Sequence, residues 1–405
     1  MHRRRRGGKL RRRSSYFPGV PQPDSSKPSV AFLIDRWDPS RGGAERAMAQ
    51  LAEFLAAKGY RVLAVAEEHA DGAPGEPVAI ASSGLTRSRR EKDRARKLAG
   101  AARSHGADVT IGCRHLYACD LYWPHGGAHA VTLSQIRRED GWPWKHFPDG
   151  PRHRTFIELE RELLERGGAR LVACVSRLVL SELAEHWPEC RDRLVLVENG
   201  IELARFHPRE RTVAGAALRA ELGIPPDMPL IAFAARNPHL KGCDALEIAL
   251  SELLSGGDTQ WRCVMAGFEA WPIERPQGID REHVVRRLDV DPVALWSAAD
   301  LCVHPTWRDT FGLGIVEALA CGTPVITTRF AGASAVVDSN AGTVLEEPEF
   351  VELHRAIAYW LERIRAGAID RAAIRRCVEH LDIARCHETL ERLVLQLANE
   401  TPAAT

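Results

Sequence analysis

The sequence predicts an α/β protein made of two doubly wound domains, each a parallel sheet covered by helices. Three observations favour this fold class. The chain has 405 residues, whereas one domain usually holds roughly 100–200, so we expect two or three domains and start from two. Short apolar runs of strand length alternate with amphipathic segments of helix length along both halves. Hydrophobic residues make up 45% of the chain and charged residues 27%, values typical of globular proteins that exclude wholesale disorder.

The first half begins with the repeating unit of a parallel sheet. An apolar run over 30–37 is followed by the glycine loop 38–43, an amphipathic helix over 44–60 and a second strand over 61–68. The alternation continues with strands predicted over 107–113, 170–176 and 193–201 and helices over 156–168 and 178–188.

The second half repeats the pattern, though not the sequence, of the first. Its strands are predicted over 230–236, 261–268, 283–288, 300–305, 324–329 and 341–347, and its helices over 244–257, 292–299, 314–322, 351–367 and 384–399. We therefore divide the chain into a basic, disordered arm (1–28), a first Rossmann-like domain (29–204), a second Rossmann-like domain (205–385) and a C-terminal helix that could pack back on the first domain (386–405).

Charge is unevenly distributed. The net charge is only +1, yet residues 3–13 carry eight basic side chains and no acid. Such an arm could lie on an anionic membrane or on nucleic acid, or it could be a tail without a specific partner. A second basic segment over 87–103 and the tryptophan-containing segment 135–147 also suit a lipid headgroup interface, with solvated helix faces as the alternative. No nucleic-acid-binding motif accompanies them, so no specific nucleic acid is expected.

The cysteines and the hydropathy of the chain indicate the cellular compartment. The ten cysteines form no C-x-x-C pair and several lie in apolar runs, a pattern typical of reduced core thiols. No run approaches the roughly 18 apolar residues of a membrane span. We expect a cytoplasmic protein, either free or attached peripherally to the inner face of the membrane.

The segment 307–324, WRDTFGLGIVEALACGTP, carries the most informative motif. It places Asp309 in a loop after a predicted strand and Glu317 within the following helix. Glycines at the start of that helix leave its backbone N–H groups free to bind an anion. Carboxylates accept paired hydrogen bonds from vicinal hydroxyls, so two acids around an anion site suit a nucleotide sugar. The residues between the acids are Phe311, Gly312, Leu313 and Gly314.

Two alternatives compete with this interpretation. Asp309 or Thr310 could simply cap the helix, with Glu317 as an exposed helical acid. A dinucleotide fingerprint G-x-G-x-x-G is the other, but Glu317 occupies the third glycine position and no acid lies near residue 334 to bind a ribose.

Basic partners follow the strand predicted at 230–236. Arg236 and Lys241 lie in its loop, where they could neutralise a diphosphate leaving group, although most single basic residues are solvated surface charges.

In the first domain, Gly42 and Gly43 begin a helix and could also bind phosphate, or they could form a plain turn. His125 follows an apolar run and could reach a cleft between the domains, with a buried structural histidine as the alternative. Asp289 and Asp291 could suggest a metal, but Asp291 followed by Pro292 is a typical helix start, so we expect no metal site.

Together these residues resemble the retaining glycosyltransferases of family 4, which have two Rossmann-like domains in the GT-B arrangement. The resemblance extends from about residue 30 to the C-terminus and depends on GGAER, VENGIELARFHP, RNPHLKG, ALWSAADLCVHP and DTFGLGIVEALACGTPVI. Within the family the chain is most similar to the lipopolysaccharide core glucosyltransferases, through DLYWPHGGAHA, HPTWRDTFGLGIVEA and FAGASAVVDSNAGTVLEEP.

The resemblance implies roles for the matching residues. Glu317 would hold the nucleotide ribose, while Asp309 and the backbone of 311–314 would hold the sugar and the diphosphate. Arg236 and Lys241 would bind the diphosphate, with Gly43 contacting phosphate from the first domain. His125 would touch the sugar. Asp309 departs from the family pattern, in which this acid is usually the longer Glu, and Gly314 replaces a usual Pro or small apolar residue, which should loosen the loop.

These observations predict an enzyme that transfers a hexose, glucose by preference, from a UDP-sugar to a glycan or glycolipid acceptor such as lipopolysaccharide core, with retention of anomeric configuration. The nucleotide sugar is a co-substrate, and no cofactor is expected. Arg236, Lys241, Asp309 and His125 are the predicted catalytic residues. The alternative is a non-catalytic protein that binds nucleotide sugars or associates with nucleic acid.

Overall fold

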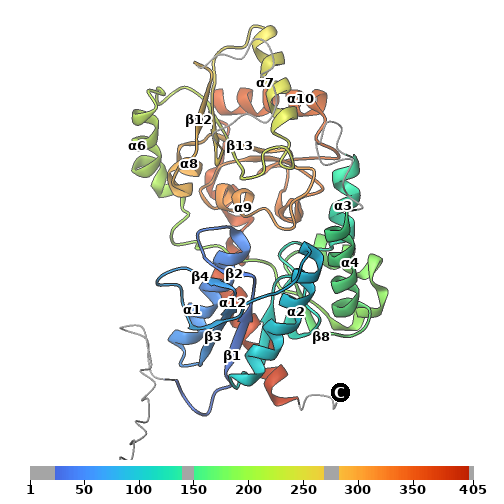
Figure 1. The fold of residues 1–405 in the computed structure, drawn as a ribbon. Coiled ribbons are helices and arrows are strands. Elements are labelled where there is room, and N and C mark those ends of the chain that lie inside the picture. Colours follow the sequence, from blue (N-terminus) through green and yellow to red (C-terminus); the bar gives the residue numbers. More distant parts are fainter. Residues whose placement is uncertain (1–22, 139–149, 269–281, 401–405) are drawn as a thin grey trace, which may run out of the picture.

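The computed structural model of the chain describes residues 23–138, 150–268 and 282–400. The arm over 3–13 and most of the predicted tryptophan segment lie outside these ranges. Figure 1 shows two domains, one above the other, each built on a parallel sheet. The predicted α/β fold class is therefore confirmed.

The first domain has a seven-stranded parallel sheet in the order β5-β3-β1-β6-β7-β8-β9. Its strands are β1 (Val30–Leu33), β3 (Val62–Ala66), β5 (Glu76–Ala79), β6 (Val109–Gly112), β7 (Cys119–Tyr122), β8 (Ala169–Cys174) and β9 (Leu194–Leu196). The helices are α1 (Gly43–Ala57), α2 (Arg87–Ser104), α3 (His129–Arg138), α4 (Pro151–Leu164) and α5 (Arg177–His186), followed by the 3-10 helix η1 (Pro188–Arg193). A separate two-stranded ladder joins β2 (Arg36–Trp37) to β4 (Glu68–His69).

The second domain has a six-stranded parallel sheet in the order β12-β11-β10-β13-β14-β15. Its strands are β10 (Leu230–Ala234), β11 (Arg262–Ala266), β12 (Val284–Arg287), β13 (Leu301–His304), β14 (Val325–Thr328) and β15 (Gly342–Leu345). Its helices are α6 (Ala214–Glu221), α7 (Cys243–Ser255), α8 (Pro292–Ala298), α9 (Leu313–Ala320), α10 (Phe350–Arg365) and α11 (Arg371–Arg376), and the last helix of the described chain is α12 (Ile383–Asn399). Short 3-10 turns lie at η2 (Pro208–Thr212), η3 (Gly332–Val336) and η4 (Glu379–Leu381).

The central strands are continuous apolar runs because helices cover both faces of each sheet. Every residue of β1, β3, β6 and β13 is buried. Parallel sheets need this two-sided cover, and their strands accordingly lose the alternation of exposed antiparallel sheets. The apolar runs predicted as strands therefore contain these buried central strands.

Both sheets reverse their strand order next to their first strand. β1 pairs with β3 on one side and β6 on the other, and β10 pairs with β11 and β13 in the same way. Open parallel sheets bind ligands beyond the carboxyl ends of the strands at such a reversal. The loops that follow β10 and β13 carry Arg236, Lys241 and Asp309, so the topology brings these residues to one edge.

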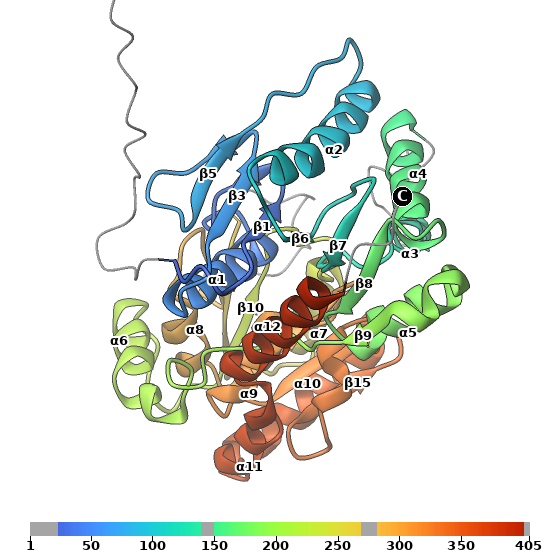
Figure 2. The same ribbon diagram turned by 90° about the horizontal axis from the view of Figure 1, so that it is seen from below.

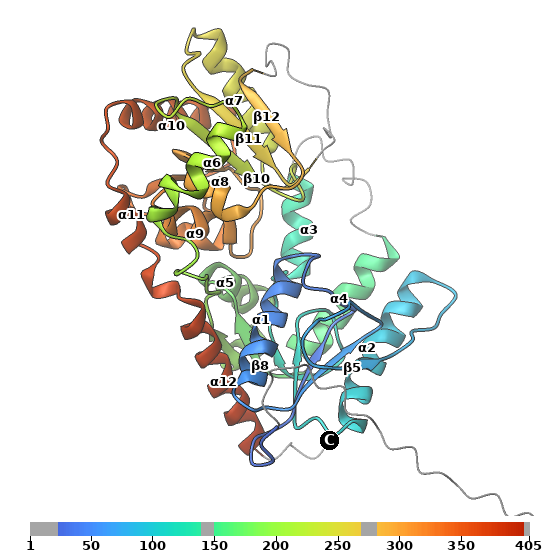
Figure 3. The ribbon, with the colours of Figure 1, turned by 90° about the vertical axis from the view of Figure 1, so that its left-hand side faces the viewer.

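The last helix, α12, returns to the first domain, and Figures 2 and 3 show it alongside that domain's strands and helices. It begins at Ile383, slightly before the predicted segment, and Asp382 caps it. Gly200 permits the crossing, because a Cβ there would lie 2.4 Å from the Cα of Ile383. Glu391 of α12 accepts a 3.0 Å hydrogen bond from the Tyr60 hydroxyl. The chain thus passes twice between the domains.

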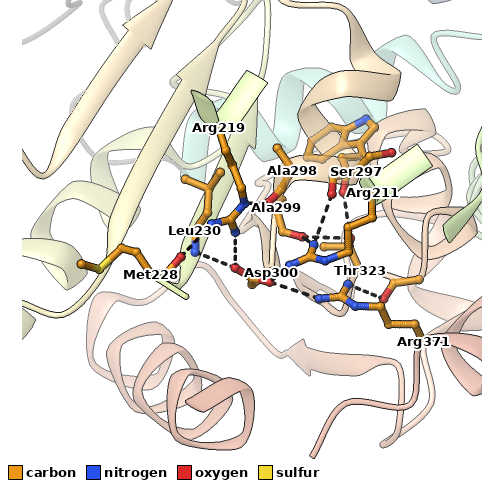
Figure 4. Close-up of polar contacts among 12 residues, drawn as sticks. Arg211, Arg219, Met228, Leu230, Ser297, Ala298, Ala299, Asp300, Thr323 and Arg371 are labelled. Carbon is orange, nitrogen blue, oxygen red and sulfur yellow. Dashed lines mark hydrogen bonds and ion pairs between the residues drawn. The ribbon is translucent and has the colours of Figure 1, made fainter. Parts of the chain in front are cut away.

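A buried carboxylate anchors the start of the second domain. Figure 4 shows the guanidinium groups of Arg211, Arg219 and Arg371 converging on Asp300, which is 6% exposed. The backbone N–H of Leu230, at the start of β10, donates to the same carboxylate at 3.0 Å. Carbonyl groups at the C-terminal end of α8 accept from the same guanidinium groups, which offsets the excess positive charge. The cluster attaches α6 and α11 to the sheet.

Candidate functional site

Helix α9 begins in the predicted glycine run. Its N-cap is Gly312, whose φ of 95° lies in the left-handed region that glycine adopts without strain, and no side chain caps the helix. The alternative that Asp309 or Thr310 caps α9 is therefore wrong. A Cβ at Gly314 would lie 3.0 Å from the indole ring of Trp296, so the missing side chain lets α8 pack against the start of α9. The uncapped N–H groups remain suited to an anion.

Asp309 is held between two basic groups of its own domain. Lys241 Nζ lies 2.7 Å from Asp309 Oδ2, and the ring of His304 bonds to the same oxygen at 3.1 Å. The N–H of Phe311 donates to Oδ1 at 3.3 Å. Burial would raise the pKa of Asp309, but the positive charge of Lys241 and the bond from His304 outweigh it and hold that pKa below the usual value. Asp309 is therefore a fixed negative charge.

Glu317 is a partly buried acid and not an exposed helical one, which removes the second half of the capping alternative. Its Oε2 accepts a 3.0 Å hydrogen bond from Trp296 Nε1. Burial raises the pKa of Glu317, while the Trp296 bond and the nearby charges of Arg46 and Arg205 oppose the shift. One carboxylate oxygen is thus engaged by Trp296, and the other accepts no hydrogen bond from the described residues.

Arg236 joins the second domain to the glycine loop of the first. Its guanidinium donates to the carbonyl oxygens of Arg41 at 2.6 Å and Ser40 at 3.0 Å. Next to this loop, α1 begins at Gly43 with Gly42 as an N-cap that makes no side-chain bond. Two helices without side-chain caps therefore begin on opposite sides of the domain junction.

The starts of α1 and α9 approach closely. A Cβ at Gly43 would lie 3.3 Å from Leu313 Cδ1, at the first residue of α9. A pocket beside this contact is lined by Gly43, Leu313, Arg46, Trp123 and Asn199 among others. Trp123 Nε1 and Asn199 Oδ1 are buried there without a hydrogen-bond partner in the described structure. The junction therefore offers unmet polar groups as well as helix N-termini.

His125 lies at the domain junction, but as a largely buried ring. It packs against Trp123 with ring centroids 4.3 Å apart, and its Nε2 is buried without a partner in the described structure. Burial lowers the pKa of His125 to about 3, so the ring is neutral near pH 7. Its carbonyl oxygen accepts a 2.6 Å bond from Thr310 Oγ1 of the second domain.

The structure also shows a residue that the sequence analysis missed. Arg308, immediately before Asp309, is 4% exposed and points away from its own domain. Its guanidinium pairs with both carboxylate oxygens of Glu182 on α5, at 2.5 and 2.8 Å. The only sequence signal was its position beside Asp309, because Glu182 lies more than a hundred residues earlier.

The described residues contain no candidate metal site and no helix that could cross a membrane. Over 23–138, 150–268 and 282–400, no group of three or more His, Cys, Asp or Glu side chains could hold a metal ion. Asp291, proposed and rejected as a metal ligand, caps α8 by accepting from the N–H of Ala294 at 3.1 Å. All ten cysteines are free thiols. None of the helices in the described part of the chain is long and apolar enough to cross a membrane.

The arrangement suits a ligand that is anionic in its middle and hydroxylated at its ends. Pairwise contacts link these groups. Arg236 bonds to the loop before α1, the start of α1 approaches the start of α9, and Lys241 pairs with Asp309 on the loop before α9. Asp309 and Glu317 provide carboxylates on the loop before α9 and on its second turn. Such a site can stabilise negative charge that develops on a diphosphate leaving group.

Two family models match the chain. The model described as "Glycosyltransferase Family 4" matches residues 41–205, and the model described as "Glycosyl transferases group 1" matches residues 228–363. Each match falls on one of the two sheets, and together they include every predicted site residue.

Curated relatives are similar over different lengths. The chain is 32% identical over 231 residues to a D-inositol 3-phosphate glycosyltransferase of Nocardia farcinica, an alignment that covers 52% of this chain and 49% of that protein. It thus spans about half the length of that relative. It is 24% identical over 328 residues to the lipopolysaccharide glucosyltransferase WaaG of Escherichia coli strain K12, covering 79% of this chain and 85% of WaaG.

Solved structures share the fold. The crystal structure of WaaG, described as a glycosyltransferase involved in lipopolysaccharide biosynthesis, superposes with a TM-score of 0.75 at 21% identity, covering 90% of this chain and 99% of that one. Anabaena Alr3699/HepE, crystallised in complex with UDP and glucose, gives a TM-score of 0.64 at 19% identity over 91% of this chain and all of that one. At such identities the likeness concerns the fold.

Proposed function

Because the chain belongs to the family 4 glycosyltransferases, we propose that it transfers a hexose from a nucleoside diphosphate sugar to a hydroxyl group of a glycan or glycolipid, with retention of anomeric configuration. Glucose is the proposed sugar and UDP the proposed nucleotide. Lipopolysaccharide core is the proposed class of acceptor.

One observation carries the proposal. Arg236 and Lys241 follow β10, and α9 follows the neighbouring strand β13, at the point where the strand order of the second sheet reverses. Arg236 also contacts the loop before α1 across the domain junction. A diphosphate between these groups would meet two cations and two helix N-termini. Glu317 is then placed to accept bonds from a ribose, and Asp309 from sugar hydroxyls.

The chemistry needs no residue that forms a covalent intermediate. The bond between the anomeric carbon and the diphosphate oxygen breaks, its electron pair leaves with the diphosphate, and the acceptor oxygen forms a new bond on the same face. The acceptor hydroxyl gives its proton to the departing diphosphate oxygen. Arg236 and Lys241 stabilise the charge that develops there, and Asp309 orients the sugar. Since His125 is neutral and buried, its proposed part is contact with the sugar rather than proton transfer.

The identities proposed for the donor and the acceptor depend on similarity to known proteins. HepE was crystallised with UDP and with glucose, and WaaG is a lipopolysaccharide glucosyltransferase, which together favour UDP-glucose and a lipopolysaccharide acceptor. The relatives named D-inositol 3-phosphate glycosyltransferases offer a second class of acceptor. An acceptor panel must therefore include both core oligosaccharide and inositol phosphate.

We further propose that the enzyme works in the cytoplasm, on the inner face of the membrane. Helix α2 carries the eight basic residues predicted over 87–103, and several are exposed, including Arg87, Arg89, Arg90 and Arg96. Co-sedimentation with vesicles tests this, with anionic phosphatidylglycerol vesicles compared with neutral phosphatidylcholine vesicles. Equal recovery of the protein with both kinds of vesicle would contradict it.

The proposed function is tested by a donor panel. Purified protein is incubated with UDP-, GDP- and ADP-glucose and with UDP-galactose, with and without the acceptors above, and nucleotide release is measured. We expect release from UDP-glucose to be fastest and to continue in EDTA, because protein cations take the place of a metal. Saturable binding of UDP without turnover of any donor would instead support the non-catalytic alternative.

A further inference from the structure

We propose that Arg308 is a positioning residue that joins the two domains through Glu182 and Thr132, biases the domains towards the arrangement described above, and so fixes the Asp309–Lys241 pair in its working geometry. This inference rests on the proposed function and adds a residue and a conformational role to it. In Figures 1 and 3, α3 extends from the first domain alongside the second, so the loop after β13 lies within reach of it.

Within the described residues, the side chain of Arg308 forms hydrogen bonds to the first domain alone. Besides its two bonds to Glu182, its Nε donates to Thr132 Oγ1 on α3 at 2.8 Å. Two helices of the first domain thus hold one guanidinium. Glu182 is itself 13% exposed on its side chain, so water screens the pair little. A bidentate pair of this kind fixes direction as well as distance.

The backbone of Arg308 points the other way, into the proposed site. Its carbonyl oxygen accepts a 2.8 Å bond from Lys241 Nζ, and its N–H donates to Thr306 Oγ1 at 3.1 Å. Lys241 therefore bonds both to the Arg308 carbonyl and to the Asp309 carboxylate. A shift of Arg308 would move both oxygens that hold Lys241.

Thr310 forms a second attachment on the far side of Asp309. Its hydroxyl donates to the carbonyl of His125 at 2.6 Å, and its own carbonyl accepts from Ser176 Oγ at 2.6 Å. Asp309 thus lies between two residues that are each bonded to the first domain, while its own carboxylate stays within the second.

Glycines make this close approach possible. A Cβ at Gly127 would lie 2.5 Å from Arg308 Nη2, and one at Gly332 would lie 2.3 Å from the carbonyl oxygen of Thr310. Side chains at either position would push the loop away from the first domain. These two glycines therefore leave space for the contacts of Arg308 and Thr310, the residues on either side of Asp309.

An ion pair that biases the two domains towards one arrangement has a kinetic consequence. Domains joined by a small interface usually move relative to each other, and a buried ion pair across the interface biases them towards one arrangement. Without it, the second domain would still bind nucleotide, but the first domain would meet the donor less often. Loss of the Arg308–Glu182 ion pair should therefore lower kcat more than it weakens nucleotide binding.

The test compares Arg308→Gln, Glu182→Gln and the double variant with the wild type. We expect each single variant to lose about tenfold or more in kcat, as misplacement of reacting groups does. Affinity for UDP by calorimetry should stay within about threefold, because the nucleotide contacts are intact. The double variant should lose no more than the worse single variant, since both remove one interaction.

Small-angle X-ray scattering of the same proteins without ligand supplies a readout independent of turnover. We expect a larger radius of gyration for Arg308→Gln than for the wild type. Arg365→Gln is the matched control, because Arg365 pairs with Asp258 inside the second domain at 2.7 Å, and it should change neither quantity. Should Arg308→Gln fail to fold, Thr132→Val removes the Nε partner alone and should shift both readouts in the same direction.

The outcomes separate this inference from the proposed function. If the wild type turns over no donor but Arg308→Gln still has the larger radius of gyration, the proposed function is wrong and the role of Arg308 in joining the domains is supported. If the wild type is active and Arg308→Gln matches it in kcat and in radius of gyration, the proposed role of Arg308 is wrong. Additive losses in the double variant would equally overturn it.

Discussion

Lys241 and Asp309 form a 2.7 Å ion pair although they follow different strands, β10 and β13. The pair is partly buried, with side chains 19% and 18% exposed. Since β10 and β13 are neighbours at the strand-order reversal of the second sheet, the pair lies where such sheets bind ligands. This relationship joins the fold to the proposed chemistry.

Replacing Asp309 by Asn keeps the shape of the side chain but removes its charge. Lys241 would lose its ionic partner, and the sugar would lose a charged acceptor of hydrogen bonds. We expect kcat/KM for UDP-glucose to fall by about 10²–10³-fold, the range for removing one electrostatic contact at a reacting centre. Steady-state kinetics check this. A fall of less than threefold in a folded variant would contradict the assigned role of Asp309.

Replacing Glu317 by Ala should abolish detectable binding of UDP-glucose by calorimetry, because the proposed ribose contact is lost. The change also leaves the buried Trp296 Nε1–H without its acceptor, so stability should fall by about 1–3 kcal/mol. Trp296→Phe is the control, because it removes the same internal bond but keeps Glu317. It should lower the melting temperature while binding the donor. Unchanged affinity in Glu317→Ala would overturn the ribose assignment.

Buried His125 predicts a loss of stability in mild acid. Burial lowers its pKa to about 3 in the folded protein, against an ordinary value of about 6.5. Between these values the unfolded chain binds a proton that the folded protein does not, so stability falls as pH drops from about 6.5 towards 3. His125→Asn should reduce the loss between pH 6.5 and 4 by about 1 kcal/mol or more in urea titrations. An identical pH dependence in variant and wild type would contradict the buried, neutral ring.

Asp300 predicts a stability effect without a catalytic one. Asp300→Asn would leave Arg211, Arg219 and Arg371 without their shared carboxylate, and removing one partner of a buried ion pair costs about 3–5 kcal/mol. Denaturant unfolding should show this loss, whereas kcat of the folded fraction should remain near the wild-type value. A large fall in kcat at unchanged stability would instead place Asp300 in the site.

The fold and several site features could be predicted from sequence because they are local. Apolar runs predicted the strands of both sheets, and glycines predicted the starts of α1 and α9. Pro292 after Asp291 predicted a helix start there, and Asp291 is the N-cap of α8. Domain boundaries and the roles of the site residues stay predictions until the experiments above are done.

Other features could not be predicted because they depend on contacts between distant segments. Nothing in the local pattern around Arg308 indicates that its partner is Glu182, or that Trp296 engages Glu317. Likewise, the burial of His125 depends on how the domains pack. Contacts between side chains of the two domains depend on how the domains pack together. Hydrophobic periodicity and composition carry no information about them.

The account's central claim is transfer with retention at the Asp309–Lys241 site. Proton nuclear magnetic resonance of the anomeric proton during turnover of UDP-glucose, whose glucose is α-linked, tests it most directly. The wild type should yield the α-configured product first, and Asp309→Asn should yield product far more slowly with the same configuration. A β-configured first product, or equal rates in the two proteins, would contradict the account.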